Sequence, residues 1–92
     1  TIFDRIKYVD LRMCFILEQM EKHFLNEKIK VLENGSDPNK ISALEGEYKI
    51  KSQKVMEIRD FISQCNNPGE FLEDEKIARL EEISKMTWED FD

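Results

Sequence analysis

A heptad pattern of apolar residues runs from position 41 to position 65. Its apolar members are Ile41, Leu44, Tyr48, Val55, Ile58, Ile62 and Cys65, and Lys51 fills the one polar position. Spacings of three and four residues place all of these side chains along one face of a helix. The pattern therefore predicts a helix over about 38–65 that packs lengthwise against another helix.

A second long helix is predicted over about 2–33. Its apolar residues recur every three or four positions, and no Gly or Pro interrupts them. The run from Met13 to Leu17 is apolar at five consecutive positions, which covers the whole circumference of a helix. We therefore expect this turn to be covered on more than one side, and Phe15 is a candidate contact for a partner protein.

The two long helices are predicted to form an antiparallel hairpin. Asn34-Gly35 is typical of a helix end, whereas Asp37-Pro38 is typical of a cap and first helical position. The short connection makes the second helix run back along the first, so residues whose numbers add to about 72, such as Phe24 and Tyr48, face each other. Lys51 then lies opposite Glu21. Either the two form a pair that fixes the register, or the Lys51 stem simply extends along the seam.

A third, shorter helix is predicted over about 69–86. Asn67-Pro68 followed by Glu70 has the pattern of a capping box. At the other end, Thr87 and Asp90 could begin a separate turn, or the helix could continue to Phe91. Both alternatives fit the sequence.

Together these elements predict an all-α fold, a long helical hairpin with a third helix across one side in a coiled-coil-like three-helix bundle. The close alternative is a homodimer that buries the same surfaces.

At 92 residues the chain is one domain, and its first residue, Thr rather than Met, indicates a piece of a longer protein. No stretch approaches the ~20 apolar residues of a membrane helix. Two cysteines without a disulfide pattern indicate a reducing, intracellular compartment, either the cytoplasm or the nucleus.

The net charge of −6 comes entirely from the end of the chain. Residues 1–69 contain equal numbers of acids and bases, whereas residues 70–92 contain nine acids and three bases. The last residues, listed in order, are Trp88, Glu89, Asp90, Phe91 and Asp92. One interpretation is that this acidic aromatic end docks on a basic protein, with the acids guiding the encounter and the rings filling pockets. The other is that Trp88 and Phe91 fold back to close the bundle.

This mixture of acids and aromatic rings resembles, in composition, short segments of some histone chaperones. The resemblance implies a basic protein such as a histone as the partner. It covers only the last five or six residues.

The sequence contains no catalytic constellation and predicts no metal site and no cofactor. His23 is the single histidine, Cys14 and Cys65 lie on opposite arms of the hairpin, and no glycine-rich loop precedes a helix. Nucleic acid is disfavoured because the net charge is negative and no basic patch is present. We therefore expect a non-catalytic protein-interaction module, for scaffolding, docking or oligomerisation. The alternatives are an acidic adaptor for a basic protein and a regulatory subunit of an enzyme complex.

Overall fold

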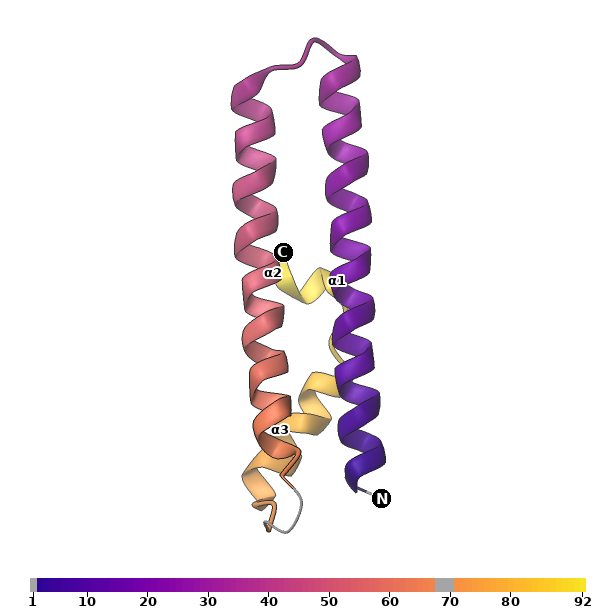
Figure 1. The fold of residues 1–92 in the computed structure, drawn as a ribbon, viewed down its shortest axis with the longest axis vertical. Helices are drawn as coiled ribbons and strands as arrows, with labels where there is room; N and C mark the ends of the chain where they lie inside the picture. Colours follow the sequence, from indigo (N-terminus) through magenta and orange to yellow (C-terminus); the bar gives the residue numbers. More distant parts are fainter. Residues whose placement is uncertain (1, 68–70) are drawn as a thin grey trace.

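The computed structural model describes residues 2–67 and 71–92 and shows a long helical hairpin with a short third helix (Figure 1). Helix α1 spans Ile2–Glu33, α2 spans Pro38–Cys65, α3 spans Asp74–Ser84, and a 3-10 turn, η1, spans Trp88–Phe91. The molecule measures 56 × 19 × 17 Å. The predicted all-α fold, in which α1 and α2 pair as a hairpin and the shorter α3 packs on α1, is confirmed.

The connection between α1 and α2 follows the predicted signals. Gly35 adopts a φ of 114° and Ser36 a φ of 57°, and the Ser36 N–H bonds the Val31 carbonyl at 3.0 Å. Gly35 has the conformation that favours glycine at a helix end. The Asp37 carboxylate accepts a 2.9 Å hydrogen bond from the Asn39 N–H, and Pro38 begins α2. The hairpin therefore turns within four residues.

The predicted register of the hairpin is confirmed. The rings of Phe24 and Tyr48 stack with centroids 4.9 Å apart. Further along, Arg59 Nε donates to Asp10 Oδ1 at 3.1 Å. Both contacts join residues that the antiparallel register places opposite each other.

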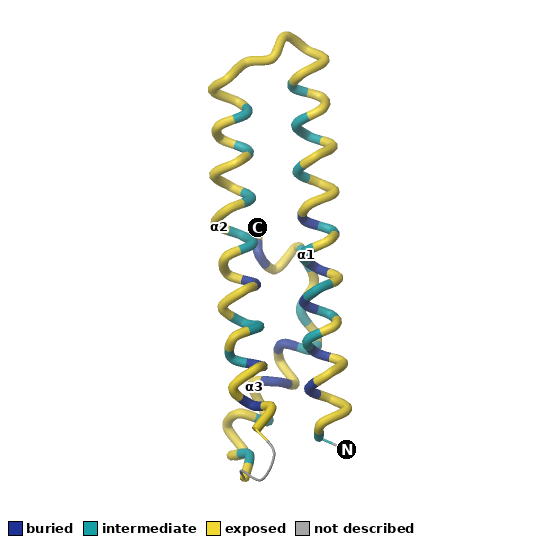
Figure 2. Tube along the Cα trace, in the orientation of Figure 1, coloured by how far each residue is buried: buried dark blue, intermediate teal, exposed yellow. Residues whose placement is uncertain are grey.

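The core occupies only one half of the hairpin, the half that α3 and η1 cover (Figure 2). Its buried hydrophobic residues are Ile6, Val9, Met13, Ile16, Met20, Val55, Ile62, Cys65, Leu80, Ile83 and Phe91. Between residues 21 and 54 no side chain is buried, so α1 and α2 form a bare two-helix arm there. The C-terminal part of the chain thus supplies the third layer to one half of the hairpin.

The third helix differs from its prediction. It begins at Asp74 and not at the predicted position 69, and residues 71–73 before it are not helical. It ends at Ser84, two residues before the predicted end. The predicted capping box involves Pro68 and Glu70, which lie outside the described residues. The observed N-cap is Glu73, and Asp74 and Glu75 follow it in the first turn, where the helix dipole favours acids.

The apolar turn at Met13–Leu17 is covered only in part within the chain. Met13 and Ile16 are fully buried, and the linker after α3 reaches this level of α1, where Arg12 Nε donates to the Met86 carbonyl at 3.0 Å. On the opposite side, Phe15 stays 57% exposed. The chain therefore leaves open the face of this turn that carries Phe15, the residue predicted to contact a partner.

Candidate interaction surface

The acidic aromatic end folds back onto the middle of the hairpin as η1 (Figure 1). Phe91 is 6% exposed and belongs to the core, and the half-buried Trp88 ring lies 5.3 Å from the His23 ring, centroid to centroid. A separate turn forms, as one alternative predicted, since Asp90 Oδ2 accepts a 2.7 Å hydrogen bond from the Thr87 N–H. Both rings therefore contribute to packing within the chain.

Lys51 holds the end of this segment. Its Nζ donates to Asp92 Oδ1 at 2.7 Å and to Glu47 Oε1 at 2.8 Å. The hypothesis of a Lys51–Glu21 pair is therefore wrong, because the returning C-terminus supplies the partner instead. These two hydrogen bonds raise the pKa of Lys51 above its ordinary 10.5, and the bond to Asp92 has the larger effect.

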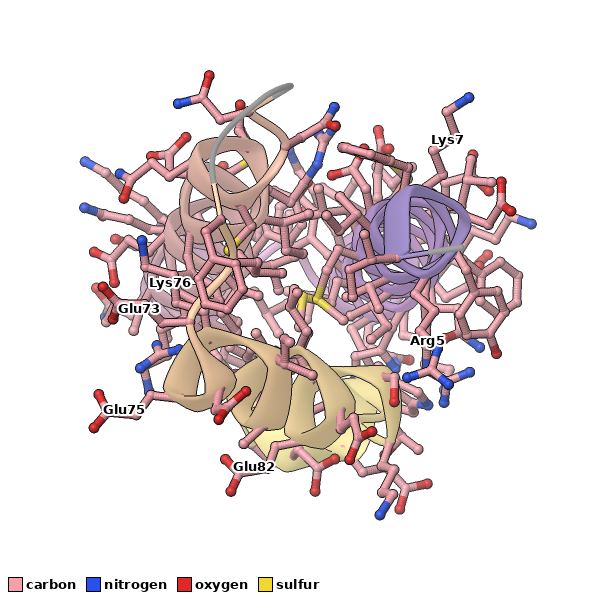
Figure 3. All side chains as sticks on the ribbon, turned by 90° about the horizontal axis from the view of Figure 1, so that it is seen from below. Arg5, Lys7, Glu73, Glu75, Lys76 and Glu82 are labelled. Carbon is pink, nitrogen blue, oxygen red and sulfur yellow. The ribbon has the colours of Figure 1, made fainter. Side chains whose placement is uncertain are left out.

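The acids of this end remain at the surface although its rings do not. Glu89, Asp90 and Asp92 are exposed. Along α3, Glu75 and Glu82 point away from the bundle into solvent (Figure 3). The docking of this acidic surface on a basic protein stays a prediction. A partner that uses the Phe91 ring would first have to detach η1 from the hairpin.

Within residues 2–67 and 71–92, no three His, Cys, Asp or Glu side chains are placed to hold a metal ion. Cys14 and Cys65 are free thiols, and burial raises the pKa of Cys65 above its ordinary value. No helix in the described part of the chain is long and apolar enough to cross a membrane.

An open groove of about 400 Å³ lies between α1 and α3. Its walls are mainly apolar, from Val9, Ile77 and Leu80, and the exposed Arg5–Glu81 ion pair, 3.6 Å long, lies at its rim. Arg5 and Glu81 are each more than 60% exposed as side chains, so water screens the pair. The groove therefore offers mainly apolar surface, with an exposed ion pair at its edge.

An exposed apolar stripe runs along the outer face of α1, away from α2. We call it the outer stripe, and its apolar members are Tyr8, Leu11, Phe15, Leu25, Ile29 and Leu32, each between 46% and 68% exposed. Spacings of three and four residues continue through it, and two charged residues, Glu18 and Lys22, occupy its central positions. It is therefore a second heptad seam on the same helix, and the described chain leaves it largely exposed, although Tyr8 also lines the groove beside α3.

Of the residues predicted to contact a partner, only Phe15 lies in the outer stripe. The other stripe residues were not predicted to contact a partner, because the two charged positions divide the pattern into two apolar groups. The signal is present in the sequence as an unbroken three–four spacing from Tyr8 to Leu32 once Glu18 and Lys22 are counted as seam positions. On α2, by contrast, the exposed large apolar residues Ile50 and Met56 stand apart and form no stripe.

Protein-family models, curated proteins and solved structures were compared with this chain, and none matches.

Proposed function

We propose that this chain is a non-catalytic helical module that works through protein–protein contact. The observation that carries the proposal is the outer stripe, where six large apolar side chains remain about half exposed along one face of a single helix. Exposed apolar surface of this extent, here in two groups on one helix face, marks an interaction site in proteins that are otherwise polar outside. The heptad spacing further indicates that the partner surface is itself a helix.

The rest of the structure is compatible with a scaffold that presents this stripe. The opposite face of α1 is fixed by the core residues Val9, Met13 and Ile16, all at most 2% exposed. Because the core lies behind the half of α1 that carries Tyr8, Leu11 and Phe15, these stripe residues are pre-arranged, which lowers the entropic cost of association.

The test is retention of binding proteins from an extract of the source cells, with the chain as bait. Two stripe variants, Leu11→Asp and Leu25→Asp, are compared with Ile50→Asp, a control of similar exposure on α2. We expect the wild type and the control to retain at least one protein that the two stripe variants do not retain. That protein can be a second copy of the chain. Identical sets of retained proteins for all four baits would refute the proposal.

A further inference from the structure

The outer stripe is arranged symmetrically about the level of Met20. Each stripe position on one side has a counterpart at the same distance on the other side, and apolar residues correspond to apolar residues throughout. The corresponding pairs are Tyr8 with Leu32, Leu11 with Ile29, Phe15 with Leu25, and Glu18 with Lys22. Such a stripe is complementary to itself when one copy is turned end over end.

We propose that the outer stripe binds a second copy of this chain, α1 against α1, antiparallel, about a two-fold axis at the level of Met20. This inference rests on the proposed function and names its partner. In an antiparallel coiled coil, each a position packs against a d position of the other helix. The stripe meets this rule. When Tyr8 is counted as an a position, each of the four pairs given above joins an a position to a d position.

The central charges determine the orientation. In the antiparallel dimer, Glu18 of each copy lies opposite Lys22 of the other, which forms two equivalent ion pairs across the axis. In a parallel, in-register dimer, Glu18 would face Glu18 and Lys22 would face Lys22. Like charges at such positions are destabilising, so the sequence favours the antiparallel arrangement.

Both central charges are available for this role. Among the described residues, neither Glu18 nor Lys22 has an ion-pair partner within 4.0 Å. They lie four residues apart on the exposed face of α1, in the order that favours an ion pair within one helix. Within the described residues they nevertheless do not form this pair.

The area available is sufficient for a weak dimer. Each of the six apolar stripe residues exposes about half of the roughly 200 Å² that a large side chain can offer. Burying these surfaces removes roughly 600 Å² per copy, or about 1,200 Å² in total, at the lower end of specific interfaces. Association in about the micromolar range is therefore expected.

The experiment is sedimentation equilibrium of the 92-residue chain from low micromolar to about millimolar concentration. The wild type should shift from 11.0 kDa towards about twice that mass. Glu18→Lys alone, and Lys22→Glu alone, should each weaken self-association about tenfold or more, because both ion pairs become like-charge contacts. An equimolar mixture of the two variants should regain wild-type association, because unlike charges face each other again only between different chains.

Two further variants sharpen the test. Glu21 flanks the stripe beside the axis, so two copies of its carboxylate approach each other, and Glu21→Gln should tighten the dimer. Ile50→Asp on α2 should leave self-association unchanged. Far-UV circular dichroism should show wild-type helicity for every variant, since all of the altered side chains are exposed.

Three outcomes would overturn the dimer. They are a constant mass of 11.0 kDa throughout, self-association that the charge changes leave unaltered, and no recovery on mixing. If the chain stays monomeric but retains another protein through the stripe, the dimer is wrong and the proposed function stands. If neither a second copy nor another protein depends on the stripe, both proposals fail.

Discussion

Truncation of Phe91 measures how strongly the C-terminal segment is held on the hairpin. Phe91 is 6% exposed, so Phe91→Ala removes roughly 120 Å² of buried apolar surface, which corresponds to about 3 kcal/mol at 25 cal/mol per Å². This value lies at the lower end of Phe→Ala substitutions in protein cores. The lower end is appropriate because η1 is only four residues long and can detach instead of leaving a cavity. For a domain of this size, the loss lowers Tm by roughly 12–24 °C.

The assay follows urea and thermal unfolding by circular dichroism at 222 nm, with Trp88 fluorescence as a second probe. Trp88 is the only tryptophan and packs near His23, so its emission reports detachment of η1. Phe71→Ala is the matched control, because Phe71 is 89% exposed and should change the free energy of unfolding by less than about 0.5 kcal/mol. Equal stabilities of the two variants, with unchanged Trp88 emission, would refute the packing argument.

Three other substitutions or treatments test separate parts of the structure. Gly46→Ala should stabilise the chain by about 1 kcal/mol in urea unfolding, since an added Cβ meets no atom within 4 Å, and a lower midpoint would contradict this. Lys51→Met should remove the contact with Asp92. Because the folded-state pKa of Lys51 is raised, this stabilisation is complete below about pH 10.5 and is lost as the pH rises through the folded value. The wild type should therefore lose stability faster than the variant above that pH. A thiol reagent at pH 8 should label half-buried Cys14 faster than Cys65, because burial raises the pKa of Cys65. Equal labelling rates of the two thiols in the folded protein would contradict this.

The hairpin could be predicted because its information is local. Periodicity sets the two helices, Gly35 and Pro38 set the turn, and a short turn leaves only one register. The stacking of Phe24 on Tyr48 follows from that register without any further information.

The path of the C-terminal segment could not be predicted in the same way. Its contacts with Lys51 and Arg12 join residues 41 and 74 positions apart, and no spacing rule links them. The short helix α3 also gave weak boundary signals, since its N-cap Glu73 forms no side-chain cap hydrogen bond. The alternatives for Trp88 and Phe91 were both chemically sound, and only long-range packing distinguishes them.

The one-sided core has a consequence for how the molecule opens. Residues 21–54 contain no buried side chain, so amide hydrogens along the bare arm should exchange with solvent through local opening, well before those of the core-backed half. In an antiparallel pair, the arm of each copy, with Leu25 and Ile29, would lie against the core-backed half of the other copy. Each copy would then stabilise the bare arm of the other copy, and protection of the arm amides against hydrogen exchange would rise with protein concentration.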